Sequence, residues 1–386
     1  MSTHGRRNEL LRTLIHQWTG AGPAARTWTQ AEVDLVWPAL EAHHTEVPLG
    51  PVLPASRLTA AHREAMAASR ERTSCLLLEL ERILPAVRAT GCEPVVLKGA
   101  GLALTAYAEP TDRWFVDLDL LVPLDRVEAV CEGLLACGYH PYHGRASWAY
   151  YDAHHVHRIL IGPVGSVVEV HWALTVPASA YHYDPQGVRA RSRRVAFGGG
   201  TCLVAAPADQ VVHAVYQHLA NGFVDLRRAL DLACQSRRMT AQDWQEVANI
   251  AAETGLERAL EFWLHVMKQL TGTRIPALPP PARPLGTLAW RMLENLDVAN
   301  GCLERRASRV PVYGQFLHQV LLTTHRKRLR DLWRMSVSSG SYGIQAGHAN
   351  RTAPAWSQRL RQGLPKLGQM AGIGLIALGV RSFETS

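Results

Sequence analysis

The sequence lacks any paired arrangement of cysteines. Its seven cysteines include no Cys-x-x-Cys pair, and their number is odd. Such a set indicates buried or free thiols in a reducing compartment and not a disulfide framework. The chain has 386 residues, of which 47% are hydrophobic and 19% charged. This composition is typical of globular proteins and excludes wholesale disorder. We therefore expect a folded, cytoplasmic protein.

Long hydrophobic runs are also missing. The stretch at residues 10–15 is interrupted by Arg12, so it does not form the apolar segment of a secretory signal. Residues 370–380 are apolar but contain three glycines, and this run is much shorter than the roughly 20 residues that a bilayer-spanning helix needs. The sequence predicts neither a signal peptide nor a transmembrane segment.

Acidic residues are scarce near the C-terminus. Residues 321–386 contain ten lysines or arginines but only two acidic residues, an excess that equals the +8 net charge of the whole chain. A basic region of this kind can contact nucleic acid or an anionic membrane. The solvated face of a helix is the simpler interpretation, and we prefer it to the polyanion contact.

Hydrophobic spacing divides the chain into helical and strand-containing parts. We predict an N-terminal helical region, an α/β core, a helical domain and a C-terminal helical, basic region, at residues 1–90, 91–200, 205–278 and 285–386. Short runs rich in β-branched residues predict strands at 94–97, 116–122 and 167–172. Apolar residues three and four apart predict helices at 56–90, 102–107, 125–137, 209–220, 226–234 and 241–270. The fold class expected from this order is α+β, with a small sheet-containing core flanked by helical regions.

The most informative stretch is Asp117-Leu118-Asp119-Leu120. Side chains alternate between the two faces of a strand, so the aspartates point the same way while the leucines enter the core. Two neighbouring carboxylates in apolar sequence repel each other and lose hydration, and a bound cation relieves both costs. Mg²⁺ prefers such oxygen ligands together with substrate phosphates. We expect Asp117 and Asp119 to bind metal; an exposed strand face is the alternative.

A predicted strand runs into the small-residue segment Lys98-Gly99-Ala100-Gly101. Backbone N–H groups at the start of a helix can bind phosphate groups. Only four of the 41 basic residues are lysines, so an ammonium group at this point is unusual. We expect Lys98, Gly99, Ala100 and Gly101 to hold nucleotide phosphates; an ordinary β-to-α turn is the alternative.

Two further charged residues accompany these segments. Glu169 is flanked by valines in the strand predicted at 167–172, where its carboxylate has the same need for a cation as the aspartate pair. Arg113 lies four residues before Asp117, where a guanidinium group can meet phosphate or orient a carboxylate. Viewed alone, Glu169 fits the solvated face of an edge strand equally well, and a solvated loop position is the simpler interpretation of Arg113.

Three histidines, His154, His155 and His157, precede the third predicted strand. Their density suggests a transition metal, but no cysteine lies nearby and Asp152 is the only close acid. Substrate contact and an exposed strand or loop are the simpler alternatives. Farther along, Arg227 and Asp231 are spaced as an ion pair on a helix surface.

Together, these segments resemble the nucleotidyltransferase superfamily of the DNA polymerase beta type, and specifically its bacterial branch of nucleotidyltransferase family proteins. The resemblance rests on VVLKGAGLALTAY, the following arginine, DLDLLV, CGY and VVEVHW, within residues 94–174. The superfamily usually has Gly-Ser, a short gap, Asp-x-Asp and a third acid on a later strand. Here the first position reads Lys98-Gly99 and the gap is longer.

The resemblance implies a mixed-sheet core and a two-metal mechanism. Asp117, Asp119 and Glu169 would bind Mg²⁺ or Mn²⁺, with Glu169 as a further candidate for the general base. An NTP would be the nucleotide substrate, and its NMP would be transferred to a hydroxyl or phosphate group as pyrophosphate leaves. The phosphates would lie on the Lys98–Gly101 segment with help from Arg113.

The acceptor is a small molecule, a peptide or a protein in this interpretation. Branch members often accompany biosynthetic gene clusters, which favours a secondary metabolite or modified peptide. The alternative from another class is a non-catalytic nucleotide-binding or regulatory protein that retains the fold.

Overall fold

The computed structural model describes residues 3–22, 26–176, 179, 181–221 and 226–279. Within them lies one seven-stranded sheet of order β3-β4-β5-β2-β1-β7-β6. The strands are β1 (Val95–Val96), β2 (Asp117–Leu121), β3 (His140–Pro141), β4 (His157–Ile161), β5 (Val167–His171), β6 (Arg193–Phe197) and β7 (Gly200–Val204). The pairs β2–β5 and β1–β7 are parallel and the other neighbours are antiparallel. The predicted α+β class with a mixed sheet is confirmed.

Along the chain, the described helices precede the strands, lie between them and follow them. They are α1 (Thr3–Thr19), α2 (Gln30–His43), α3 (Glu46–Leu49), α4 (Ala60–Ala89), α5 (Lys98–Thr105), α6 (Val127–Ala136), α7 (Trp148–His154), α8 (Pro185–Arg191), α9 (Pro207–Asn221), α10 (Leu226–Ser236), α11 (Ala241–Thr254) and α12 (Glu257–Thr271). The single helix predicted at 241–270 is wrong, because Gly255 adopts a left-handed conformation (φ 75°) and ends α11. The predicted start of α5 is also late, since the helix begins at Lys98.

All three predicted strands are confirmed, but β3, β4, β6 and β7 were not predicted. The strand β4 carries a histidine and an arginine at its start, and β6 begins with two arginines. These polar side chains interrupt the apolar alternation that identifies a strand in sequence. The short turn at Gly198-Gly199, where both residues have positive φ, joins β6 to β7. The sheet thus extends to Val204.

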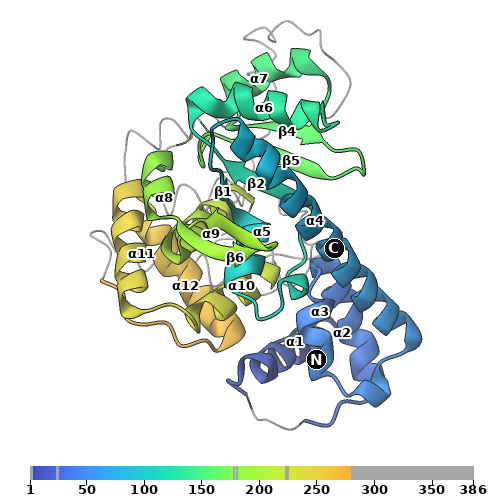
Figure 1. Ribbon diagram of the computed structural model, residues 1–386. Helices are drawn as coiled ribbons and strands as arrows, with labels where there is room; N and C mark the ends of the chain where they lie inside the picture. Colours follow the sequence, from blue (N-terminus) through green and yellow to red (C-terminus); the bar gives the residue numbers. More distant parts are fainter. Residues whose placement is uncertain (1–2, 23–25, 177–178, 180, 222–225, 280–386) are drawn as a thin grey trace, which may run out of the picture.

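The long helix α4 links the N-terminal helices to the sheet. Thr59 caps its start through a capping box with His62. Near its other end, the buried side chains of Leu80, Ile83 and Val87 share a hydrophobic core with β2 and α6. Figure 1 shows α4 running from α2 and α3 to the sheet. One face of the sheet is therefore covered by α4 and α6.

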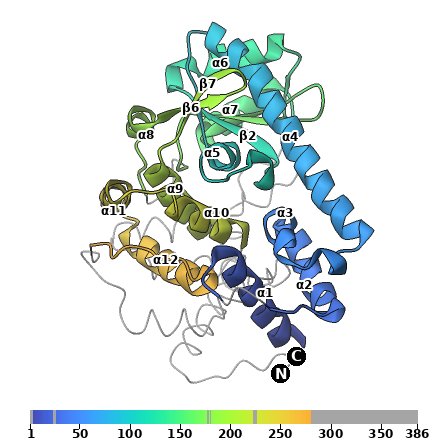
Figure 2. The same cartoon turned by 60° about the horizontal axis from the view of Figure 1, so that its bottom comes forward.

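A second core lies on the opposite face of the sheet. It joins Leu14 of α1, Val212 of α9, Trp263 of α12 and Leu121 of β2. Figure 2 shows α5, α9 and α10 between the sheet and the helices α1 and α12. The N-terminal helices and the helices after residue 205 therefore bury their apolar faces together. Asp117 and Asp119 lie on this face of the sheet, because Leu118 and Leu120 point into the first core.

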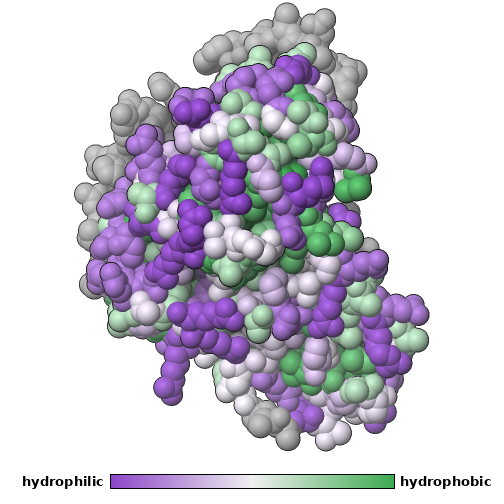
Figure 3. Space-filling model, viewed as in Figure 1, coloured by the Kyte–Doolittle hydropathy of each residue, from purple (hydrophilic) through white to green (hydrophobic). Residues whose placement is uncertain are grey.

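Apolar exposure on the surface is scattered. Large exposed hydrophobic side chains include Leu78, Leu124 and Val164. Figure 3 shows hydrophilic residues over much of one face, with smaller hydrophobic areas between them. Among the described residues, no helix combines the length and apolar character that a membrane span requires. The basic segment 321–386 and the apolar run 370–380 lie outside the described residues.

Candidate functional site

Three carboxylates meet on one face of the sheet. The parallel pairing of β2 with β5 puts Asp119 directly beside Glu169, and Asp117 lies two residues before Asp119 on the same face. Their oxygens lie within 4.8 Å of one another. The side chain of Asp119 is 1% exposed and that of Glu169 is 15% exposed. The structure therefore brings together all three acids that the sequence singled out.

The carboxylates of this cluster differ in their affinity for protons. Burial, together with the negative charges of Asp119 and Glu169, raises the pKa of Asp117 to about 7. Burial also disfavours the charged form of Glu169, but the hydrogen bond from His171 and the charge of Lys98 outweigh it. The pKa of Glu169 lies well below its usual value. The raised pKa of Asp117 indicates that the neighbouring cations do not fully offset the negative charge of the three carboxylates.

Lys98 projects into the carboxylate cluster from the start of α5. Its Nζ donates to Oδ1 of Asp119 at 2.5 Å and lies 3.3 Å from Oε2 of Glu169. Burial would lower the pKa of the ammonium group, but the neighbouring carboxylates raise it above its ordinary value. The backbone of Lys98 has a φ of 44°, a left-handed conformation that is strained for a residue with a side chain. The strand-to-helix junction therefore directs this ammonium group at the acids.

Two histidines complete the cluster, and the sequence did not indicate His171. Nε2 of His171 lies 2.8 Å from Oδ1 of Asp119 and 3.0 Å from Oε2 of Glu169. His157, on β4, places its Nδ1 3.5 Å from the same Glu169 oxygen. Burial lowers the pKa of His157 to about 4. The spacing of two residues from Glu169 is the signal that could have identified His171.

A divalent cation fits the carboxylate set. Oδ2 of Asp119 is buried and has no hydrogen-bond partner, although a buried polar atom normally has one. The three carboxylates supply the oxygen donors that Mg²⁺ and Mn²⁺ prefer. A cation bound between them would satisfy the unpaired oxygen and offset the repulsion that raises the pKa of Asp117.

The glycines of the Lys98–Gly101 segment are buried at the start of α5. A Cβ on Gly99 would lie 2.5 Å from Cβ of Phe115, and one on Gly101 would lie 3.0 Å from the carbonyl oxygen of Val96. Close packing against Phe115 and β1 therefore explains why these residues are glycine. No side chain of the capping residue Leu97 bonds the first N–H groups of α5. These donors remain suited to an anion.

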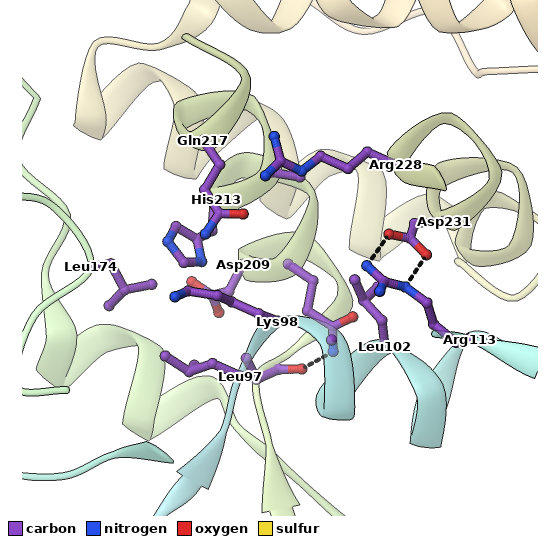
Figure 4. Close-up of a pocket in the computed structure, with 14 residues that line it drawn as sticks. Leu97, Lys98, Leu102, Arg113, Leu174, Asp209, His213, Gln217, Arg228 and Asp231 are labelled. Carbon is purple, nitrogen blue, oxygen red and sulfur yellow. Dashed lines mark hydrogen bonds and ion pairs between the residues drawn. The ribbon is translucent and has the colours of Figure 1, made fainter. Parts of the chain in front are cut away.

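A pocket lies at this helix start, between α5, α9 and α10. Leu97, Lys98 and Gly99 form one wall, and Figure 4 shows His213 of α9 and Arg228 of α10 facing them. Two aspartates in the lining already have cationic partners: Arg191 bonds Asp209, and Arg113 bonds Asp231. Arg228 adds a further cation to the lining, whereas Nζ of Lys98 is bonded to Asp119.

Arg113 contacts a carboxylate of the helical domain. Its Nε and one terminal nitrogen each donate to Asp231 at 2.7 Å, and its other terminal nitrogen donates to the carbonyl oxygen of Trp114. Tyr107 also donates to Asp231, at 2.8 Å. Asp231 is buried, so the interpretation of Arg227 and Asp231 as a surface pair is wrong. The contact of Arg113 with phosphate stays a prediction.

The three histidines before the third predicted strand do not act as one unit. His157 belongs to the cluster above. The ring of His155 lies beside those of Tyr151 and His157, with centroid distances of 4.9 Å and 5.7 Å. The side chain of His154 lies outside the described part of the structure.

Comparison with protein families agrees with this geometry. Residues 24–272, more than half of the chain, match a family model described as uncharacterised nucleotidyltransferase. No curated protein matches the chain. The match confirms the resemblance identified from the sequence and supports a general role in nucleotidyl transfer. The chain with this acidic sheet face and neighbouring pocket belongs to the family of uncharacterised nucleotidyltransferases.

Proposed function

We propose that this protein is a metal-dependent nucleotidyltransferase that moves an NMP from an NTP to an acceptor and releases pyrophosphate. The acceptor is a hydroxyl or phosphate group of a small molecule, a peptide or a protein. The observation that carries the proposal is the meeting of three carboxylates, one with an unpaired buried oxygen, beside an uncapped helix start. The carboxylates can bind the metal ions of a metal–triphosphate complex, and the N–H groups at the start of α5 can bind its phosphates.

Asp117, Asp119 and Glu169 would hold two Mg²⁺ or Mn²⁺ ions. Such ions, when bound, neutralise charge on the phosphates and lower the pKa of the attacking hydroxyl group. The rigid pairing of β2 with β5 holds the carboxylates ready before substrate arrives, which reduces the reorganisation that the reaction requires. Glu169 is more exposed than Asp119. An acceptor hydroxyl can therefore approach Glu169. Its role as proton acceptor comes from the family resemblance, and it requires that bound substrate and metal displace Lys98 and His171, which lower its pKa here.

The pocket next to Lys98 would hold the triphosphate. The first N–H groups of α5 and the side chains of Lys98 and Arg228 supply its donors and positive charge. Asp209 and Asp231 do not oppose an anion strongly, because each is bound to an arginine. Arg113 would act mainly by fixing the segment before β2 to α10, so that pocket and carboxylates keep their relative position.

Calorimetric titration of the full chain with each of the four NTPs tests the proposal. We expect one NTP to bind with Mg²⁺ and to bind at least about tenfold more weakly in EDTA or in the double variant Asp117→Asn, Asp119→Asn. Asp125→Asn is the matched control, because Asp125 follows the same strand and its side chain is 77% exposed. An NTP affinity that is the same with and without metal, and the same in wild type and the double variant, would favour the non-catalytic nucleotide-binding alternative. No binding of any NTP would contradict the proposal.

A further inference from the structure

A second set of potential ligands adjoins the carboxylates on the same sheet face. The antiparallel pairing of β4 with β5 puts His157 directly opposite His171, with ring centroids 4.8 Å apart. Glu169 lies on the same face of β5, two residues before His171. The ligand atoms of His157, Glu169 and His171 lie within 4.8 Å of one another. Two imidazoles and a carboxylate therefore converge on one point.

Hydrogen bonding accounts for the position of His171 but not for that of His157. Nδ1 of His157 is buried and has no hydrogen-bond partner. It lies 3.5 Å from Oε2 of Glu169, beyond the usual range of an N–H···O hydrogen bond. Nε2 of His171 lies 3.0 Å from the same oxygen. If His157 served only to orient Glu169, its Nδ1 would be expected to lie as close to Oε2 of Glu169 as Nε2 of His171 does.

We propose that His157, Glu169 and His171 form a binding site for a divalent transition-metal ion of the Zn²⁺ class. Imidazole nitrogen is a preferred ligand of such ions, whereas Mg²⁺ selects oxygen. Three protein ligands leave an open position for water or an oxygen of a substrate. The site is distinct from the all-oxygen set because two of its three ligands are nitrogens, and Glu169 is shared. This inference goes beyond the proposed nucleotidyl transfer and does not depend on it.

Lys98 limits how the site fills. Its Nζ lies 3.4 Å from Nε2 of His171 and 3.3 Å from Oε2 of Glu169. An ion bound between these atoms would repel the ammonium group, so Lys98 would have to leave Glu169 for the site to fill. The pocket beside α5, which Lys98 also lines, offers the side chain another position.

Metal titration of the full chain, stripped with a chelator and free of nucleotide and Mg²⁺, tests the site. Co²⁺ serves as the spectroscopic probe, and Zn²⁺ affinity follows from its displacement of Co²⁺. We expect visible absorption bands typical of nitrogen ligation in the wild type. His157→Gln should weaken Zn²⁺ binding by about tenfold or more, since even the loss of a supporting residue costs about 10–100-fold in affinity. Thermal unfolding of each variant checks that it is folded.

Two control variants separate this site from its neighbours. His155→Gln removes the adjacent imidazole, which is outside the ligand set, and should leave Zn²⁺ affinity within about threefold of wild type. Asp117→Asn should weaken Mg²⁺-dependent NTP binding far more than Zn²⁺ binding, and His157→Gln should show the reverse preference. Equal Zn²⁺ affinity in wild type and His157→Gln would overturn the proposal. A wild-type Co²⁺ spectrum without nitrogen ligation would do so even if the variant fails to fold.

Discussion

The structure contains two clusters of buried charge, and the charges are compensated differently in each. In one, Arg113 and Asp231 form a two-pronged pair that uses both carboxylate oxygens, with Tyr107 as a third donor. In the other, three carboxylates meet one lysine and two histidines, and Oδ2 of Asp119 has no partner. The first cluster is balanced within itself. The second is left with excess negative charge.

Buried charges that stabilise the fold can thus be told apart from buried charges that are suited to a ligand. A buried ion pair with every polar atom bonded holds two elements in register but has nothing to offer a substrate. A cluster with an unpaired oxygen and a carboxylate whose pKa is raised to about 7 is destabilised without a cation. Substitutions in the two clusters should therefore have opposite consequences for stability.

The largest expected effect comes from Arg113→Met. The substitution leaves Asp231 buried without its cation, and breaking such a pair typically costs about 3–5 kcal/mol. Urea unfolding followed by tryptophan fluorescence should show a loss of this size in the free energy of unfolding. A loss below about 1 kcal/mol would mean that the pair does not stabilise the fold as described.

The second prediction concerns Asp117→Asn and pH. The folded state binds the proton of Asp117 more tightly than the unfolded chain does, so the contribution of Asp117 to the free energy of unfolding falls as pH rises between about 4 and 7. In EDTA, raising the pH from about 5 to about 7.5 should cost wild type about 2–3 kcal/mol more than Asp117→Asn. Urea unfolding at the two pH values measures this difference. Parallel pH dependence in the two proteins would contradict the excess charge of the cluster.

Lys98→Met should change two affinities in opposite directions. Without the ammonium group, the carboxylates attract a cation more strongly, and we expect Mn²⁺ to bind about threefold to tenfold more tightly in the absence of nucleotide. The triphosphate loses a positive contact, so Mg²⁺–NTP should bind about tenfold more weakly. Electron paramagnetic resonance of free Mn²⁺ and calorimetry with NTP give the two values. Weaker Mn²⁺ binding would show that Lys98 supports the metal site and does not compete for it.

The smallest effect should come from an ion pair in neither cluster. Arg145 and Glu132 pair at the surface with side chains 57% and 47% exposed, and such pairs contribute about 0–1 kcal/mol. Arg145→Met should therefore change the free energy of unfolding by less than about 0.5 kcal/mol. A loss comparable to that of Arg113→Met would remove the distinction between buried and exposed pairs on which the comparison rests.

The sequence was sufficient to predict those parts of the site that depend on local periodicity. Alternation along β2 predicted that Asp117 and Asp119 share a face, and both leucines between and after them are buried as expected. Valines around Glu169 predicted β5 in the same way. The strand β4 was not predicted, because its first residues are polar and break the strand pattern. It forms a strand because it pairs with β5.

Contacts between distant segments could not be predicted. His157 and His171 become neighbours only through the register of β4 against β5. Arg113 and Asp231 are 118 positions apart, and the packing of α10 beside α5 decides that the guanidinium meets a carboxylate. The direction of Lys98 likewise depends on a left-handed backbone conformation at the start of α5, which no residue type there requires.

A crystal structure with Mn²⁺ and a non-hydrolysable NTP analogue, recorded at the manganese absorption edge, would locate the metal and the nucleotide directly. We expect an anomalous peak about 2.0–2.2 Å from carboxylate oxygens of Asp117, Asp119 and Glu169. We also expect the triphosphate to reach the first N–H groups of α5. Manganese or nucleotide bound elsewhere, with the carboxylate cluster unchanged, would contradict the assignment of this sheet face as the active site.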